Sequence, residues 1–267
     1  MPTVEQNVAM WDRQYAWSGH GDEWSERWGG TEAMWQCVLH PRVYRFLRVP
    51  TILEIAPGHG RWTQYLKDAC DSLIVVDLSE TCIAACRERF AGESHIQYHV
   101  NDGTSLAMVP DGSVDFVFSF DSLVHAEADV LEAYVGQLTR KLKPTGAGFI
   151  HHSNAGAYSG RLALHRKASR VLVNRAGHFL RNRLIINPAW RAEDVTAARF
   201  AGWCDRAGIP CAGQELVNWL NWACLIDCFS VFAPAGSPHA HPNRVWSNRR
   251  FMREAAQARR FAAQYLR

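Results

Sequence analysis

Several features that would assign a chain to another class of protein are missing from this sequence. Its eight cysteines include no Cys-x-x-Cys pair, so we expect small buried thiols in a reducing cytoplasm and not a zinc site. No apolar run approaches the roughly 18 residues that span a bilayer, and the first residues lack the charged-then-apolar pattern of a signal peptide. These absences predict a cytoplasmic protein without a transmembrane segment.

An excess of charge of one sign is also missing from the chain as a whole. The 29 Lys and Arg residues nearly balance the 26 Asp and Glu residues, which gives a formal net charge of +3. The basic footprint of a nucleic-acid-binding protein is therefore absent, and we expect a small molecule or a glycan as the partner. Hydrophobic residues make up 48% of the 267 positions, which argues against disorder and allows one large core with an added cap.

A glycine-rich turn after an apolar strand is the most informative stretch of the chain. It reads ILEIAPGHGRWT from Ile52 to Thr63. The dinucleotide fingerprint Gly-x-Gly-x-x-Gly would need a third glycine where Thr63 stands, so a pyrophosphate-binding turn fits poorly. Gly58 and Gly60 still allow positive φ and the close approach of a ligand. At the carboxyl end of the first strand of an open α/β sheet, such a turn predicts a nucleotide-like cofactor.

Further apolar runs predict a mostly parallel sheet, because they are too continuous for strands with one solvated face. A long helix and a Lys-Pro-Thr-Gly break separate the fourth strand from the fifth, and the last two strands would form an antiparallel edge hairpin. After the strand that begins at residue 52, strands are predicted over 73–79, 96–100, 114–120, 148–150, 214–219 and 226–232, with helices over 126–142 and 192–208 and the break at 143–146.

The pattern Glu54-x-Ala56-x-Gly58-x-Gly60 resembles the first motif of class I S-adenosylmethionine (SAM) methyltransferases, with Ala56 in the usual first-glycine position. The order of strands and helices over residues 50–155 also matches that family, and the chain resembles bacterial small-molecule and sugar O-methyltransferases. The resemblance implies an α/β, Rossmann-like sheet of seven mostly parallel strands with helices on both faces. It also implies a helical N-terminal cap and a helical insertion after the fifth strand.

The resemblance assigns cofactor-binding residues as well. Asp77 lies 23 residues after Glu54, close to the offset of about 20 at which an acid meets a ribose hydroxyl in nucleotide-binding folds. An acid after the third strand is implied near the adenine, and aromatic residues of the N-terminal segment are implied to fold over the cofactor. The implied SAM contacts are Glu54, Ala56, Gly58, Gly60, Asp77, Asp102, Gly103, Trp11 and Tyr15.

Composition divides the chain into five parts. From Ala133 to Ala192 there are eleven Lys or Arg residues and no Asp or Glu, which favours a basic lid for an anionic substrate. A solvated helical face and a surface for a polyanion or a membrane remain open, as does docking of the last helix on a second subunit in a homodimer. The predicted parts are an N-terminal helical cap (1–49), a SAM-binding core (50–154), a basic helical insertion (155–190), the rest of the core with its edge hairpin (191–235), and a linker with a C-terminal helix (236–267).

The edge after the fourth strand suits transfer to oxygen. The Asp/Asn-Pro-Pro-Tyr run of the family's nucleobase and amide N-methyltransferases is missing there, and the sequence reads SFDSLVH from Ser119 to His125. Asp121 and His125 are four residues apart, so one helical turn would place them on the same side. Histidine titrates near neutrality and can accept the proton of a hydroxyl group. We therefore predict His125 as the general base.

Residues after the fifth strand resemble part of a metal site. In metal-dependent catechol-type O-methyltransferases, acids and an asparagine at these two strand ends hold magnesium. Asp121, His152 and Asn154 resemble that layout, although a histidine in place of an acid would hold a hard cation less tightly. The implied catalytic set is His125, Asp121 and His152, and Mg²⁺ or another divalent cation at Asp121, His152 and Asn154 remains open.

The predicted function is SAM-dependent methylation of a hydroxyl group on a sugar, a glycan or a glycosylated small molecule. The basic insertion suits a polar acceptor, and the first 49 residues contain five of the eleven tryptophans, whose rings could stack on sugar faces. Two alternatives stay open. One is an N- or carboxyl-methyltransferase of a small metabolite, and the other is a non-catalytic protein that binds SAM or a polyanion.

Overall fold

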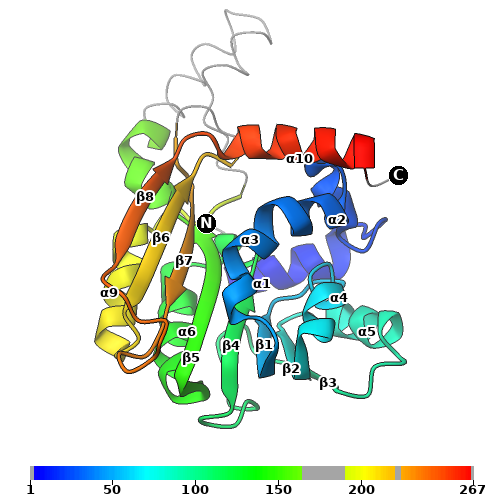
Figure 1. Cartoon of the computed structure of the whole chain (residues 1–267), viewed down its shortest axis with the longest axis horizontal. Helices are drawn as coiled ribbons and strands as arrows, with labels where there is room; N and C mark the ends of the chain where they lie inside the picture. Colours follow the sequence, from blue (N-terminus) through cyan, green and yellow to red (C-terminus); the bar gives the residue numbers. More distant parts are fainter. Residues whose placement is uncertain (1–2, 164–189, 220–223, 266–267) are drawn as a thin grey trace, which may run out of the picture.

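One eight-stranded mixed sheet forms the centre of the molecule (Figure 1). The computed structural model describes residues 3–163, 190–219 and 224–265. The strand order is β3-β2-β1-β4-β5-β7-β6-β8. The strands are β1 (Val49–Ile55), β2 (Cys70–Asp77), β3 (Ile96–Val100), β4 (Val114–Ser119), β5 (Leu142–Ser153), β6 (Cys211–Val217), β7 (Asp227–Phe232) and β8 (Arg244–Asn248).

The first five strands are mutually parallel, as predicted, and β7 runs antiparallel to both of its neighbours, β5 and β6. The predicted number of seven strands is wrong, because β8 pairs in parallel with β6 inside the segment expected to be only a linker and a helix. The β6–β7 hairpin is therefore not at the edge of the sheet. Four of the five β8 residues are exposed, so this strand lacks the apolar pattern by which a buried strand is found.

The predicted break at 143–146 also needs correction, because these residues belong to β5. The pairing of β4 with β5 shifts register between Val114 and Phe116. This irregularity lets β5 begin at Leu142 although Pro144 cannot donate a backbone hydrogen bond. At its other end β5 continues to Ser153. The strand is therefore longer at both ends than the apolar run that predicted it.

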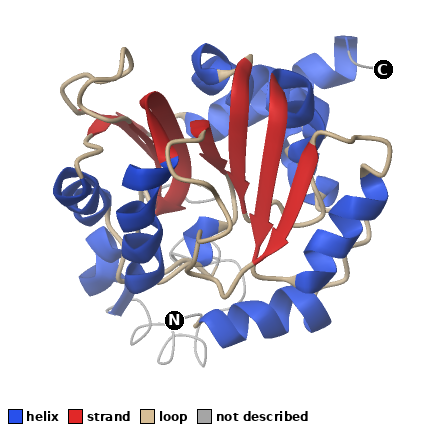
Figure 2. Cartoon of the chain, turned by 90° about the horizontal axis from the view of Figure 1, so that it is seen from below, coloured by secondary structure: helices blue, strands red, loops and turns tan. Residues whose placement is uncertain are grey.

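Short helices precede the sheet, and both short and longer helices follow its strands. Figure 2 shows helices on both faces of the strands. The N-terminal cap contains α1 (Val4–Val8), η1 (Ala9–Gln14), η2 (Asp22–Trp28), α2 (Thr31–Met34), η3 (Trp35–Leu39), α3 (His40–Val43) and η4 (Tyr44–Phe46). The later helices are α4 (Thr63–Leu66), η5 (Lys67–Ala69), α5 (Glu80–Arg89), η6 (Leu123–His125), α6 (Ala128–Lys141), η7 (Ala155–Tyr158), α9 (Ala197–Ala207) and α10 (Phe251–Tyr265).

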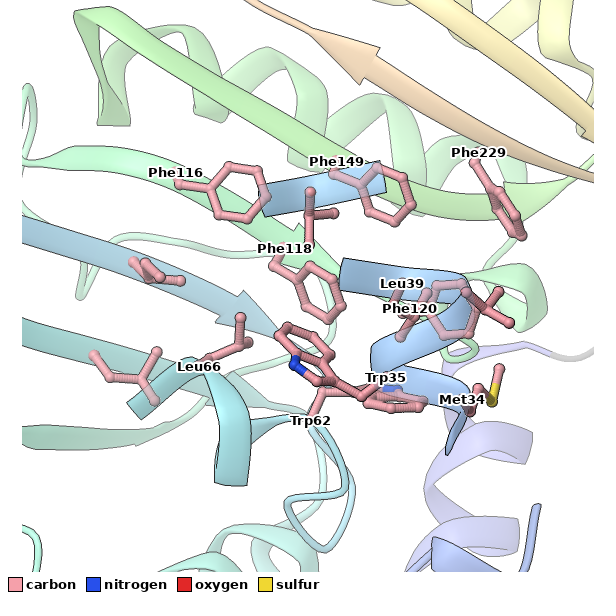
Figure 3. Close-up of a cluster of buried hydrophobic side chains, with 14 of the residues drawn as sticks. Met34, Trp35, Leu39, Trp62, Leu66, Phe116, Phe118, Phe120, Phe149 and Phe229 are labelled. Atoms are coloured by element: carbon pink, nitrogen blue, oxygen red, sulfur yellow. The ribbon is translucent and has the colours of Figure 1, made fainter. Parts of the chain in front are cut away.

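Alternating strand residues build two cores, because successive side chains of a strand point to opposite faces. One face packs against the cap, α4, α5 and α10, and the other packs against α6 and α9. Figure 3 shows the first core, where phenylalanines of β4, β5 and β7 meet Trp35 and Leu39 of the cap and Trp62 of the turn. The strand residues of the first core include Ile52, Leu73, Phe116, Phe118 and Phe149, and those of the second include Leu53, Ile74, Val117 and Ile150.

The helix α10 lies along the top of the molecule in Figure 1 and packs on the cap. Contact with η2 is close at Gly29, where an added Cβ would lie 2.6 Å from the Cβ of Ala262. Arg42 of α3 forms ion pairs of 2.8 Å with Glu215 of β6 and with Glu254 of α10. These contacts tie the cap, the sheet and α10 together.

Most of the predicted basic insertion lies outside the described residues. Of the span 155–190, the structure describes η7 and the start of a helix at 159–163, and then Trp190. The lid therefore remains a prediction. In the described part of the chain, no helix is both long and apolar enough to cross a membrane.

Candidate active site

The turn between β1 and α4 forms one wall of a cavity between the sheet and the cap. The φ angles of Ala56, Gly58 and Gly60 are 58°, 59° and 85°. An added Cβ at Gly60 would lie 2.5 Å from the ring of Phe90, so glycine is needed there. Ala56 holds a left-handed conformation that glycine adopts more easily.

Glu54 and Asp77, the first two acids predicted to bind the cofactor, differ in whether they line the cavity. Glu54 is buried beneath the turn, where it accepts a 2.6 Å hydrogen bond from the Thr63 hydroxyl, and burial raises its pKa to about 8. Asp77 lines the cavity. Its two oxygens accept backbone N–H groups of Gly58 and Ser79 at 3.2 and 2.9 Å, and burial raises its pKa to about 6. Each Asp77 oxygen has a second lone pair for a ribose hydroxyl.

The far end of the cavity is formed by Gly103 and Tyr134. Asp102 is exposed, and its Oδ1 accepts the backbone N–H groups of Thr104 and Ser105 at 2.8 and 2.7 Å, which lowers the pKa of Asp102. The Asp102 carboxylate therefore stabilises the turn that follows it in the chain. The structure places Gly103, and not the Asp102 carboxylate, in the cavity wall.

Aromatic side chains of the cap form the opposite wall. Trp11, Trp17 and Trp24 line the cavity, with ring centroids 5.3–5.9 Å apart. Trp17 stacks on His59 of the turn at 4.2 Å. Tyr15 packs behind this wall and donates a 2.8 Å hydrogen bond to Glu23. Trp11 and Tyr15 were predicted to contact the cofactor, whereas Trp17 and Trp24 were not. The high tryptophan content of the cap could have indicated them.

Asp121 lies two residues after the end of β4 and has a left-handed φ of 64°. Its Oδ2 accepts a 2.8 Å hydrogen bond from Arg61, which is only 4% exposed. The Arg61 guanidinium lies between the rings of Trp24 and Trp62, 5.3 and 4.6 Å from their centroids. The Asp121 carboxylate is therefore held in a buried ion pair at the cavity wall.

A second ion pair, between Arg191 and Asp227, lies next to the Arg61–Asp121 pair. Arg191 binds both oxygens of Asp227 at 3.0 and 2.9 Å, and it lies 3.8 Å from Asp121. Although burial alone would raise it, Arg191 and His151 hold the pKa of Asp227 well below its usual range. His151 accepts the Asp121 backbone N–H at its Nδ1 (3.1 Å), so its proton is on Nε2, 3.2 Å from Asp227.

Arg61, Arg191 and Asp227 were missed from the sequence. Arg61 follows the glycine turn, which was an available signal. Arg191 and Asp227 belong to no motif, and only the pairing of β7 with β5 brings Asp227 beside Ser153 and His151.

His125, on η6, also lines the cavity. Its Nδ1 lies 2.8 Å from the carbonyl oxygen of Trp190. A carbonyl only accepts hydrogen bonds, so Nδ1 carries the proton and Nε2 keeps a lone pair. Burial, followed by the charge of Arg191, lowers the pKa of His125 to about 4. The structure therefore brings Asp121 and a neutral His125 to one cavity.

The predicted grouping of His152 and Asn154 with Asp121 needs correction. Because β5 runs on to Ser153, His151 faces the cap and His152 faces the other side, where it stacks on Phe200 at 4.1 Å. Its Nε2 lies 2.8 Å from the Ser230 hydroxyl. Asn154 donates to the Leu225 carbonyl and accepts the Ala197 N–H, at 2.7 and 2.9 Å.

Neither side chain is directed at the cavity, so the predicted donor set for Mg²⁺ is not assembled. Within the described ranges, no group of three His, Cys, Asp or Glu side chains is arranged to hold a metal ion.

Residues 52–146 match a family model described as a methyltransferase domain. Over these residues, the chain is therefore similar to a methyltransferase domain. Its cofactor is SAM, and the cavity fits it. Asp77 has free lone pairs at the end of β2, and the turn at Gly58 admits a ligand close to the backbone.

The similarity to curated proteins covers limited lengths of both chains. The chain is 32% identical to phosphoethanolamine N-methyltransferase 1 of Triticum aestivum over 106 residues, which are 39% of this chain and 21% of that protein. It thus spans about a fifth of that relative.

Among solved structures, a putative sarcosine dimethylglycine methyltransferase from Galdieria sulphuraria has a TM-score of 0.56 at 12% identity, covering 77% of this chain and 86% of that one. The PH0226 protein from Pyrococcus horikoshii OT3 has a TM-score of 0.52 at 18% identity, covering 85% and 95%. These two likenesses establish the fold alone.

Proposed function

We propose that this protein is a SAM-dependent methyltransferase that methylates a hydroxyl group of a small, sugar-like acceptor, with His125 as the general base. One observation supports it above the others. The Trp190 carbonyl fixes the proton of His125 on Nδ1, which leaves a proton-accepting Nε2 on a residue that lines the same cavity as Asp77.

The cavity offers groups for each part of the cofactor. Asp77 would accept hydrogen bonds from the ribose hydroxyls, and the turn from Ala56 to Gly60 would lie against the methionine part. Gly103 and Tyr134 would flank the adenine. When bound, SAM supplies a methyl group on a positively charged sulfur, which is already activated for displacement.

His125 would take the hydroxyl proton as the acceptor oxygen bonds to the methyl carbon. The acceptor is left neutral, and the positive charge leaves the sulfonium as it appears on the imidazole. The total charge in the cavity is unchanged, so a base whose pKa is about 4 in the free protein can still accept the proton. Orientation of the two reacting atoms remains the main task of the protein.

The aromatic cap supports a sugar-like acceptor. Trp11 and Trp24 line the cavity with His125 and Asp121, and indole rings offer flat apolar faces for the C–H groups of a sugar ring. The Arg61–Asp121 ion pair adds donors and acceptors for its hydroxyl groups.

A second candidate is methylation of a small amine. It is favoured by the similarity of part of this chain to a phosphoethanolamine N-methyltransferase. His125 could also take a proton from an ammonium group, so the products must distinguish the two candidates.

The test is methyl transfer from labelled SAM to matched hydroxyl and amine acceptors, with the products identified by mass spectrometry. In His125→Asn, the side-chain amide can still donate to the Trp190 carbonyl but cannot act as the base. A positioned base is worth about 10²–10⁴ in rate, so we expect kcat to fall by that factor while SAM affinity is kept. The control His239→Ala removes a half-buried imidazole that packs on Phe46, away from the cavity.

Normal turnover by His125→Asn would refute the base, and exclusive labelling of amines would refute the hydroxyl acceptor. Because burial lowers the pKa of His125 to about 4, kcat should not fall through loss of this base until the pH approaches that value.

A further inference from the structure

Asn7 of α1 is a buried amide that joins the cap to the turn carrying His125. The residue is 7% exposed. Its Nδ2 donates to the backbone carbonyl of His125 at 3.2 Å, and its Oδ1 accepts the indole N–H of Trp11 at 3.3 Å. A carbonyl only accepts and an indole N–H only donates, so a single orientation of the amide satisfies both partners.

Trp11 extends this connection toward the cofactor turn. Its backbone carbonyl accepts the indole N–H of Trp17 at 3.0 Å, and Trp17 stacks on His59. A continuous series of contacts therefore crosses the cavity from His59 to His125. Every side chain between these two histidines belongs to the cap.

The same contacts enclose the His125 ring. Trp11 and Trp190 lie 5.6 and 5.7 Å from it, between ring centroids. The ring is tied through Nδ1 to the Trp190 carbonyl, and the backbone of the residue is tied to Asn7. With both ends held, Nε2 has one preferred direction.

We propose that Asn7 is a positioning residue that aligns His125 for methyl transfer and holds Trp11 over the acceptor. This role rests on the proposed function of His125. Capping of α1 alone does not account for Asn7, because the capping box of this five-residue helix is formed by Thr3 and Gln6. The amide of Asn7 points away from that box to a residue 118 positions later in the chain.

Two substitutions separate the bond of Asn7 to His125 from its bond to Trp11. Asn7→Asp keeps an acceptor for the Trp11 indole but cannot donate to the His125 carbonyl, whereas Asn7→Ala loses both bonds. Misplacement by about 1 Å can cost about 100-fold in rate. We expect both variants to lower kcat by about 10- to 100-fold, with a smaller change in SAM affinity measured by calorimetry.

The matched control is Gln6→Ala. It removes the exposed half of the capping box on the same helix without touching His125. If loosening of α1 were the cause, Gln6→Ala would lower kcat as much as Asn7→Ala.

A readout independent of turnover is the titration of the His125 ring in NMR spectra, assigned with His125→Asn. Burial lowers the pKa of His125 from 6.5 to about 4, and Arg191, Asp121 and Asp227 are the charged groups that act on it. In Asn7→Ala, the ring should gain water and titrate closer to 6.5, while Gln6→Ala should leave its titration unchanged.

The positioning role is supported if both Asn7 variants lose kcat and Asn7→Ala shifts the titration while Gln6→Ala does neither. It is overturned if Asn7→Ala keeps wild-type kcat and titration, or if Gln6→Ala reproduces both changes. A fully active His125→Asn would remove the proposed base. The titration of His125 in Asn7→Ala would then still decide whether Asn7 positions that ring.

Discussion

At the scale of single residues, the left-handed backbone conformation of Ala56 costs folding free energy. An L-residue in the left-handed region costs roughly 1–2 kcal/mol, and Ala56 has a φ of 58°. Glycine would relieve this cost, although it adds about 0.5–1 kcal/mol of conformational entropy to the unfolded chain. The strain is the larger of the two effects.

We therefore expect Ala56→Gly to raise the free energy of unfolding by about 0.5–1 kcal/mol, measured by urea denaturation. Ala201→Gly within α9 is the control, since glycine in an ordinary helical conformation should lower stability by about 1 kcal/mol. A loss of stability in Ala56→Gly would show that the methyl group makes contacts worth more than the strain.

At the scale of elements, the end of β5 decides which polar groups reach the cavity. Three additional strand residues, His151 to Ser153, place His151 toward Asp121 and His152 toward Phe200. Both faces of β5 are buried at this point, so hydropathy cannot assign the faces.

This arrangement predicts turnover without an added divalent cation. The side chains of His152 and Asn154 are occupied by Ser230, Leu225 and Ala197, which leaves Asp121 without the partners of the predicted metal site. Incubation with EDTA followed by gel filtration should leave kcat unchanged. Loss of activity that Mg²⁺ restores would contradict this expectation.

The elements that were predicted correctly are those with strong local signals. The run that became β2 contains four consecutive apolar residues, Leu73 to Val76, the run that became β4 is apolar except at Asp115 and Ser119, and the glycine turn has a fixed spacing. The β8 strand and the Arg191–Asp227 pair depend on contacts between distant segments, which no local pattern encodes. His125 was singled out from the sequence because it follows a strand end, whereas Asn7 gave no signal because its partner lies far along the sequence.

At the scale of the whole molecule, buried ionisable groups lower the stability of the fold at both acidic and alkaline pH. Burial lowers the pKa values of His59, His125 and His152 from 6.5 to about 4. The unfolded chain therefore binds more protons between these values, and stability falls as the pH drops from 6.5 to 4. Burial raises the pKa of Glu54 from 4.5 to about 8. The folded protein therefore keeps a proton that the unfolded chain loses, and stability also falls as the pH rises from 4.5 to 8.

Replacing Glu54 by Gln should remove the alkaline limit, since an amide can still accept the Thr63 hydrogen bond without ionising. We expect the gain in unfolding free energy to be about 2 kcal/mol larger at pH 8 than at pH 6, measured by urea denaturation at both pH values. The exposed Glu88→Gln should show no such difference. Equal gains for Glu54→Gln at the two pH values would mean that Glu54 is ionised throughout.

The close contact between Gly29 and α10 also has a consequence for the order of assembly. During synthesis on the ribosome, the η2 segment is made long before residues 251–262, so the cap must wait for the helix that covers it. Contacts between segments so far apart form late, because the intervening chain must first be closed into a loop. The contact between η2 and α10 can thus form only after every strand of the sheet has been made.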